Sequence, residues 1–270
     1  NDGSSLVRLP VGSDGALLKA DSSAPNGVSW GGGSTTSYAD YGARVQDIAG
    51  ADLLGYWRMN DASGPITDLT GNSNNGVVNG SPTFEAEGPI IDDPTSKSVS
   101  FDGSQWINVG QPAALDVDIT QQPLTLAAWF RTDSGTDDRT IAGRGSGTND
   151  ADRWWLMQLS SEDDFETSIM TTFNNGGAAP GGNTWKLWIL QMEPDGQGGV
   201  DWWGYLNNDL QDSGNASGSP NTDINFTIGA DTNGDEKAVG EISEVMVIER
   251  SLTEAERVSL SANLVNPGSP

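Results

Sequence analysis

Cysteine and histidine are both absent from the 270 residues of this sequence. Their absence excludes disulfide bonds, zinc sites built from Cys and His, Ser-His-Asp triads and Cys-His nucleophiles. If the protein is secreted, it must be stabilised without disulfides, by its core, by a metal ion or by association with other chains.

Long hydrophobic runs are missing as well. No stretch approaches the roughly 18 consecutive apolar residues that a transmembrane helix needs, so we expect no insertion into a membrane. Basic residues are also scarce, because 13 Lys and Arg stand against 38 Asp and Glu, which gives a formal charge of −25. Nucleic acid is not an expected partner, since phosphate groups are bound by a basic face.

The acidic composition is biased toward aspartate. Asp provides 27 of the 38 acidic residues, and Lys provides 4 of the 13 basic ones. Charge repulsion on such a surface is tolerable at molar salt, where the Debye length is about 3 Å. A halophilic source is one hypothesis, and an ordinary acidic extracellular protein is the alternative.

Glycine, in contrast, is abundant, with 35 residues. From residue 53 onward, turn-forming clusters separate short runs of β-forming residues, and helical patterns do not alternate with them. This organisation predicts an all-β sandwich and not a parallel α/β fold. The Asp102-Gly103 pair is typical of a hairpin turn. The predicted strands are Leu53–Met59, Ser98–Phe101, Gln105–Val109, Leu124–Arg131, Thr140–Gly143, Trp154–Leu159, Ser168–Phe173, Trp185–Met192, Val200–Leu206, Asn225–Gly229 and Val245–Ile248.

The N-terminal part has a different character. Residues 1–37 are rich in Ser, Gly and Asp, and only two short β segments, Ala16–Ala20 and Gly27–Trp30, fit between the Pro and Gly residues. Such an extended arm cannot bury its own apolar side chains, so we expect it to need a partner chain or a docking surface. Residues 38–50 predict a helical connector, because apolar residues recur there every three or four positions.

Five stretches in the same order resemble the laminin-G-like domains, which share the concanavalin A-like sandwich. The most specific is the closing motif from Gly240 to Glu256, G-x-I-x-E-V-x-V-x-x-R-x-L-T-x-x-E, which ends in a capping box for a short helix. The resemblance implies a jelly-roll β-sandwich over residues 51–263, followed by a short tail, 264–270. The chain departs from the family at Ser243, where Asp is usual.

The stretch from Leu9 to Trp30 resembles a linker of phage and virus tail fibres, L-P-x-G-x-D-G-x-x-L-x-A-D-S-x-A-P-x-G-x-x-W. This implies a virion structural protein, either a head or tail fibre or a capsid decoration, on the virion surface. The arm would form a homotrimer and contact other virion proteins through residues 1–50. The sandwich would bind a glycan or protein of the host surface. A disordered linker is the alternative, and a secreted or cell-surface lectin-like module is the rival function.

Two acidic clusters offer the oxygen ligands that Ca²⁺ takes in proteins. The first is Asp68, Asn72 and Asn74, and the second, with the one-three-five spacing of a calcium loop, is Asp231, Asn233 and Asp235. The family resemblance implies a structural calcium site at Asp68, Asn72 and Glu244. The alternative is that these Asp and Asn side chains cap turns.

Ten tryptophans are present, including the doublets at 154–155 and 202–203. Adjacent strand residues point to opposite faces. If Val200 and Trp202 face the core, then Asp201, Trp203 and Tyr205 share the other face. An exposed ring beside carboxylates can stack on a sugar while the carboxylates accept hydrogen bonds from its hydroxyl groups. The alternative is that the rings are buried. The candidate carbohydrate-binding residues are Trp203, Tyr205, Asp201 and Trp154.

Glycoside hydrolysis is the least expected function. Glucanases of the concanavalin A-like fold carry alternate carboxylates on one strand. In this chain strict alternation places Glu241 and Ser243 on one face and Glu244 on the other. We therefore assign no catalytic residue and expect no enzymatic activity.

Overall fold

The computed structural model describes residues 17–20, 28–31, 40–91, 93–132, 138–145, 153–159, 165–170, 172–175, 183–218 and 224–262. The chain divides into two units, Asn1–Ala39 and Asp40–Pro270. In the first unit, strand β1 (Leu17–Ala20) pairs antiparallel with β2 (Val28–Gly31). Both expected β segments of the arm are therefore strands, and they pair with each other.

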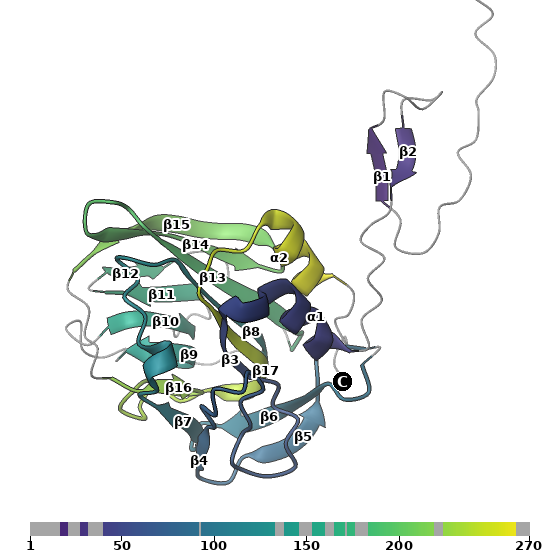
Figure 1. Cartoon of the computed structure of the whole chain (residues 1–270). Helices are drawn as coiled ribbons and strands as arrows, with labels where there is room; N and C mark the ends of the chain where they lie inside the picture. Colours follow the sequence, from purple (N-terminus) through teal and green to yellow (C-terminus); the bar gives the residue numbers. More distant parts are fainter. Residues whose placement is uncertain are drawn as a thin grey trace, which may run out of the picture. The chain divides into compact units, whose positions relative to one another are not determined.

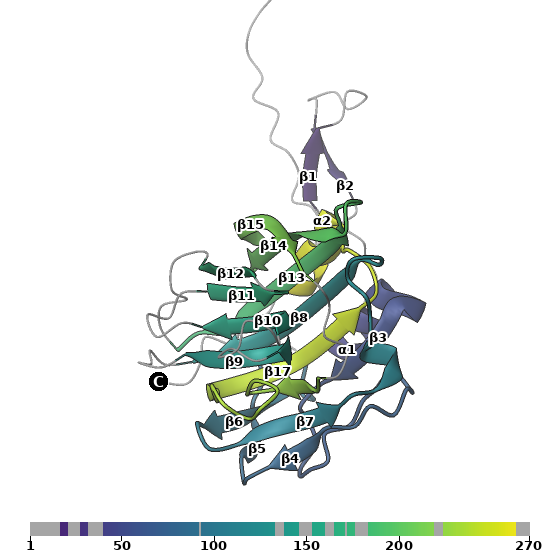
Figure 2. The same cartoon turned by 90° about the vertical axis from the view of Figure 1, so that its left-hand side faces the viewer.

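The second unit is a sandwich of two antiparallel sheets (Figures 1 and 2). In the described part of the chain one sheet has eight strands in the order β15-β14-β13-β8-β17-β6-β5, with β3 beside β17, and the other has seven in the order β12-β11-β10-β9-β16-β7-β4. The strands are β3 (Leu53–Trp57), β4 (Val77–Asn79), β5 (Thr83–Glu87), β6 (Lys97–Asp102), β7 (Trp106–Gly110), β8 (Leu124–Arg131), β9 (Arg139–Gly145), β10 (Arg153–Leu159), β11 (Phe165–Ile169), β12 (Thr172–Asn175), β13 (Lys186–Pro194), β14 (Gly199–Leu206), β15 (Asp209–Ser217), β16 (Phe226–Ile228) and β17 (Val239–Ile248). The predicted jelly-roll β-sandwich is confirmed.

Strand β17 is covered on both faces, as its unbroken apolar run predicts. Val245 and Val247 belong to the main core between the sheets. Met246 and Ile248 belong to a second apolar cluster on the outer side of the eight-stranded sheet. Because successive side chains of a strand alternate, one strand supplies both cores.

Two helices cover that second cluster (Figure 1). Helix α1 (Tyr41–Ala49) is capped by Asp40, whose Oδ1 accepts a hydrogen bond from the amide of Ala43 at 2.8 Å. Helix α2 (Glu254–Ser261) begins with the expected capping box of Thr253 and Glu256. Tyr41 joins the two helices, because its hydroxyl donates to the carbonyl of Leu260 at 3.1 Å.

Helix α1 is part of the sandwich unit. Tyr41, Val45 and Ala49 are buried in the second cluster. The segment that we expected to be a connector therefore contributes to the core. Short 3-10 turns, Gly50–Asp52 and Ala113–Leu115, complete the helical elements of the described residues.

Two local predictions are wrong. Strands β6 and β7, which flank the Asp102-Gly103 turn, belong to different sheets, so this turn leads from one sheet to the other and makes no hairpin. The predicted strand Ser168–Phe173 is two strands, β11 and β12, separated by a turn at Met170, which has a left-handed φ of 54°. In both cases turn and strand propensities act locally, whereas pairing partners are chosen by the whole fold.

Among the described helices, none has both the length and the hydrophobicity that crossing a lipid bilayer requires.

Candidate functional site

Strand β14 places Trp202 and Trp203 on opposite faces of the eight-stranded sheet. Val200 and Trp202 are buried in the main core. Asp201, Trp203 and Tyr205 are half-buried on the outer face. The predicted alternation is therefore confirmed, and an indole ring with a carboxylate on the same face reaches the surface.

The neighbours of Trp203 follow from the strand register. Gln191 of β13 and Ser213 of β15 lie directly opposite Trp203 on either side. In the same way, Asp201 lies between Glu193 and Asn215, both of which are exposed. Directly opposed residues share a face of the sheet. We call the open part of this surface the Trp203 face, which consists of Glu193, Asp201, Trp203, Ser213 and Asn215.

Asn215 holds the acidic side chains of this region in place. Its Nδ2 donates to Oδ1 of Asp201 at 3.0 Å and to Oδ2 of Asp195 at 3.2 Å. The Trp203 face thus combines a flat aromatic ring with the carboxylate of Asp201, whose position is set by a hydrogen bond. Such a surface can stack on an apolar ring face and accept hydrogen bonds from hydroxyl groups.

Tyr205 has a structural partner. The guanidinium of Arg257, on α2, lies 4.0 Å from the centre of the Tyr205 ring. Arg257 also donates to Oε1 of Gln191 at 3.0 Å and to the carbonyl of Leu252 at 2.8 Å. Tyr205 therefore packs against the helical cover and lies at the border of the open surface. The fourth candidate, Trp154, has its backbone in β10, and its side chain lies outside the described residues.

The first residues expected to bind calcium stabilise a turn. Both carboxylate oxygens of buried Asp68 accept backbone hydrogen bonds, Oδ1 from Tyr56 at 3.2 Å and Oδ2 from Asn74 at 3.0 Å. Asn72 donates its side-chain amide to the carbonyl of Leu54 at 3.0 Å. These bonds fasten the 68–76 turn to β3.

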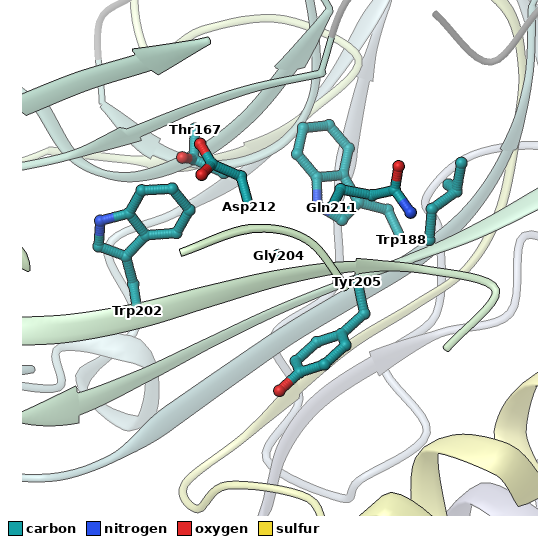
Figure 3. Close-up of a pocket in the computed structure, with 8 residues that line it drawn as sticks. Thr167, Trp188, Trp202, Gly204, Tyr205, Gln211 and Asp212 are labelled. Carbon is teal, nitrogen blue, oxygen red and sulfur yellow. The ribbon is translucent and has the colours of Figure 1, made fainter. Parts of the chain in front are cut away.

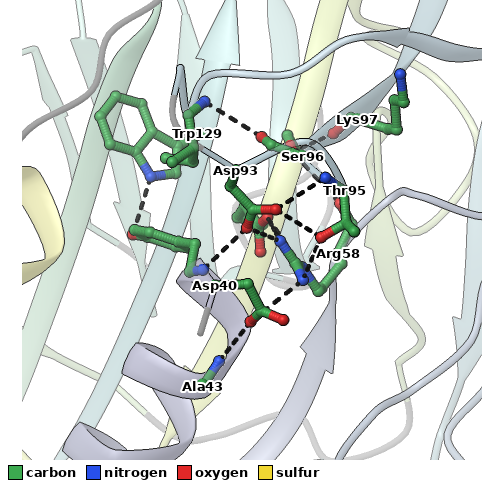
Figure 4. A network of polar contacts seen from close by, with 12 residues as sticks. Asp40, Ala43, Arg58, Asp93, Thr95, Ser96, Lys97 and Trp129 are labelled. Atoms are coloured by element: carbon green, nitrogen blue, oxygen red, sulfur yellow. Dashed lines mark hydrogen bonds and ion pairs between the residues drawn. The ribbon is translucent and has the colours of Figure 1, made fainter. Parts of the chain in front are cut away.

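Glu244, the third expected ligand, is wholly buried. It belongs to a polar network around Arg58, Asp93 and Asp40, and Figure 4 shows these three residues. Its Oε1 accepts from Nε of Arg58 at 3.1 Å, and its Oε2 accepts from the hydroxyl of Tyr56. Arg58 also pairs with Asp93 at 2.6 Å and with Asp40 at 3.5 Å. A guanidinium therefore neutralises Glu244, where we expected a calcium ion to do so. This set of residues does not fit a metal.

The network shifts the ionisation of its members. Burial raises the pKa of Glu244 to about 7, and the charge of Arg58 only partly opposes this. Burial also acts to raise the pKa of Asp93, but hydrogen bonds from Thr95, the amide of Tyr41 and Arg58 lower it to about 2. The carboxylate of Glu244 is thus the group of this network that takes up a proton near neutral pH.

The second expected calcium loop also uses its carboxylate as a cap. Oδ1 of Asp231, which is fully buried, accepts from the amides of Asn233 at 2.9 Å and Asp235 at 2.7 Å. Within the described ranges, no three acidic side chains converge in a way that could hold a metal ion. Calcium at Asp231, Asn233 and Asp235 stays a prediction, and these hydrogen bonds favour turn capping.

One sequence-based placement on β17 is wrong. Glu244 lies on the same outer face as Glu241, since it reaches Tyr56 in the second apolar cluster while Glu241 pairs with Arg131 at 3.2 Å. The cause is a bulge between Ser243 and Met246, at which Glu244 has a left-handed φ of 49°. A bulge adds one residue and reverses the alternation beyond it.

Sequence reasoning also missed Arg58. The available signal was an arginine directly after a strand of apolar residues, because a buried cation needs an acidic partner. The partner could not be chosen from 38 acidic residues without the fold.

A family model described as the concanavalin A-like lectin/glucanases superfamily, Laminin_G_3, matches residues 101–256. The chain belongs to this superfamily. The laminin-G-like resemblance of the sequence is confirmed. Residues 9–30 lie outside the matched range, so their resemblance to a tail-fibre linker stays a prediction. No curated protein shows a significant match to the sequence.

Solved structures share this concanavalin A-like fold. Domain 4 of AbnA, a GH43 extracellular arabinanase from Geobacillus stearothermophilus, in complex with arabinotriose, has 16% identity and a TM-score of 0.54, over 78% of this chain and 98% of that one. The sialidase of Trypanosoma rangeli has 15% identity and a TM-score of 0.56, over 79% of this chain but 33% of the sialidase. The receptor binding domain of botulinum neurotoxin C/D mosaic serotype has 12% identity and a TM-score of 0.54, over 78% of this chain and 51% of that one. At these identities the likeness shows the fold alone.

Proposed function

We propose that the sandwich is a glycan-binding adhesion module whose ligand lies against the Trp203 face. The observation that carries this proposal is the partial exposure of Trp203. Six other tryptophans are fully buried, namely Trp57, Trp129, Trp155, Trp185, Trp188 and Trp202. Burying an aromatic ring is strongly favourable, so a ring left partly at the surface beside a carboxylate supports a ligand at this face.

The chemistry of the Trp203 face indicates the kind of glycan. The indole of Trp203 stacks on the apolar face of a sugar ring, and Asp201 and Glu193 accept hydrogen bonds from its hydroxyl groups. The side chains of Asn215 and Ser213 can donate hydrogen bonds to the sugar or accept them from it. Because the chain carries a formal charge of −25, we expect neutral sugars and not sialic or uronic acids.

Two of the fold relatives make this class of ligand reasonable. The arabinanase domain was solved in complex with arabinotriose, and the toxin domain is a receptor binding domain. Those properties belong to those proteins. They support a carbohydrate or receptor ligand for this chain. The contacts of the Trp203 face indicate where that ligand would bind.

The setting that we propose is a virion, in which the module faces the host and residues 1–39 mount it as a trimer. The support is the tail-fibre-like motif between Leu9 and Trp30, within which β1 and β2 pair. A secreted or cell-surface lectin-like module is the alternative setting. The mass of the intact protein in solution, compared with that of residues 40–270, separates them. A trimer that becomes a monomer on truncation supports the fibre, and a monomer in both cases supports the alternative.

The proposal is binding without cleavage. Glu241 is paired with Arg131, and Glu244 is buried against Arg58, so neither is placed as an acid or nucleophile beside an open surface. A retaining or inverting pair needs two carboxyl groups flanking the scissile bond. Release of reducing ends from a bound glycan would contradict this part of the proposal.

An immobilised array of neutral and acidic glycans tests the function directly. We expect selective binding to neutral glycans, and loss of that binding in Trp203→Ala. An array without any binding, or with binding unchanged by Trp203→Ala, overturns the assignment of the ligand to the Trp203 face.

A further inference from the structure

The inner side of strand β14 carries a second feature, a small pocket between the two sheets (Figure 3). The rings of Trp188 and Trp202 stand on either side of Gly204, which has no side chain to fill the space between them. Tyr205 points away, toward the outer face. The cavity volume is about 10 Å³. It is lined by Thr167, Trp188, Trp202, Gly204, Tyr205, Leu206, Gln211 and Asp212.

The wall opposite Gly204 comes from the other sheet. Thr167 lies on β11, is 5% exposed and lines the pocket. Its Oγ1 is buried and has no hydrogen-bond partner among the described residues. Leaving a buried hydroxyl without a hydrogen bond is unfavourable, so a polar group that reaches this atom would be stabilised.

The mouth is formed by a β-bulge. Gly204 lies opposite Asp212 and Tyr205 opposite Leu210, so Gln211 is the additional residue of β15. Gln211 and Asp212 are both half-buried and stand at the edge of the sheet. A carboxylate and an amide therefore frame the entrance to an otherwise apolar slot.

The size of the slot limits what it accepts. Its narrow interior has room for about one water molecule. A methyl group is of similar size and, unlike water, needs no hydrogen bonds from the two indole walls. The sugar ring that carries the methyl group stays outside the slot, at the edge formed by β15.

We propose that this Gly204 pocket binds the methyl group of a 6-deoxy or N-acetylated sugar, whose adjacent hydroxyl or amide group hydrogen-bonds to Thr167 and Asp212. The proposal rests on the proposed glycan-binding function, but it concerns a different site from the Trp203 face. The shared chemistry is a methyl group next to a polar group on a sugar ring.

Gly204 offers a variant that blocks the pocket and keeps the fold. A Cβ atom placed on Gly204 lies 3.8 Å from Nε1 of Trp188 and 4.0 Å from Cζ3 of Trp202, both ordinary van der Waals distances. Gly204→Ala therefore fills the slot without strain. We expect its thermal stability to equal or exceed that of the parent, because alanine has less conformational entropy to lose than glycine.

The experiment uses sugars in matched pairs that differ at the carbon bearing the methyl group: L-fucose against L-galactose, L-rhamnose against L-mannose, and N-acetylglucosamine against N-formylglucosamine. Affinity is measured by titration while the indole N–H signals of Trp202 and Trp203 are followed by NMR. One methyl-bearing sugar is expected to bind at least tenfold more tightly than its partner, a usual effect for one carbon-sized group in a fitted pocket. It should shift the Trp202 signal and lose at least tenfold in affinity in Gly204→Ala.

Equal binding within every pair, or unchanged affinity in Gly204→Ala, overturns the pocket. Trp203→Ala separates the two sites. If Trp203→Ala abolishes glycan binding and Gly204→Ala leaves it unchanged, the proposed function is supported and the pocket proposal is wrong. If only Gly204→Ala loses binding, the pocket proposal is supported and the assignment to the Trp203 face is wrong. If no sugar binds to the parent protein, both proposals are wrong.

Discussion

Nη2 of Arg58 lies 3.1 Å from Oε1 of Glu244 inside the polar network that joins helix α1 to strands β3 and β17. Both side chains are buried, so an unpaired charge on either would be costly. The pair is completed by Asp93, which also accepts from the amide of Tyr41 at the start of α1. The helix is thus tied to the sandwich through charged groups as well as through apolar contacts.

Protonation of Glu244 makes stability depend on pH. Its pKa is about 7 in the folded protein and 4.5 in an unfolded chain, so the folded state holds the proton more tightly. The resulting stabilisation is complete below about pH 4.5 and is lost as the pH rises toward 7. Over this range the contribution amounts to on the order of 3 kcal/mol.

Glu244→Gln removes this titration and keeps a hydrogen-bonding side chain. We expect the free energy of unfolding of the parent to fall relative to that of Glu244→Gln between pH 4.5 and 7. Urea unfolding at several pH values measures the difference, and Glu241→Gln is the control for general charge repulsion. Parallel curves for parent and Glu244→Gln would show that Glu244 does not titrate in this range.

Asp93 is expected to act in the opposite direction at low pH. Its pKa is lowered from 3.8 to about 2, so its contribution is present above pH 3.8 and is lost as the pH falls toward 2. Asp93→Asn should remove this fall in the free energy of unfolding at low pH. The pH dependence between pH 4.5 and 7, which comes from Glu244, should remain. The same loss of stability between pH 3.8 and 2 in Asp93→Asn as in the parent would contradict the prediction.

Calcium is expected to add no stability through Glu244, because Arg58 and Tyr56 already occupy its carboxylate. We predict that any rise in melting temperature on adding Ca²⁺ after chelation is the same in Glu244→Gln as in the parent. A rise that is lost in Asp231→Asn assigns the ion to the 231–235 loop. A rise that is lost only in Glu244→Gln would show that the ion displaces Arg58.

Truncation at two positions tests the role of helix α1. A chain that starts at residue 40 keeps the Asp40 cap and its pairing with Arg58. A chain that starts at residue 51 loses the burial of Tyr41, Val45 and Ala49, which are at most 2% exposed. We expect the shorter chain to lose on the order of 5 kcal/mol, since each large buried apolar side chain contributes about 1.5–3 kcal/mol. Equal melting temperatures would show that the helix is only a connector.

Substitution of Trp203 has a quantitative expectation. Removing an aromatic anchor from a binding surface costs about 2 kcal/mol or more, roughly thirtyfold in affinity. Trp203→Phe should restore part of the loss, because a ring remains. Trp106→Ala is the matched control, a half-buried tryptophan on β7 in the other sheet. Equal losses for Trp203→Ala and Trp106→Ala would indicate a general effect on the fold.

The sequence by itself determined the features that depend on local periodicity. The apolar run at the end of β17, the capping box of α2 and the outward position of Trp203 all follow from side-chain spacing along one element. Spacing is a property of the chain, so these features could be predicted residue by residue.

Only the tertiary structure decided which elements meet. The Asp102-Gly103 turn joins two sheets because β6 pairs with β17 while β7 pairs with β16. The bulge at Glu244 turns that side chain toward Arg58, and the slot at Gly204 exists because Thr167 of the other sheet closes it. Pairing partners and cavities depend on contacts between residues far apart in the chain, which local propensity does not encode.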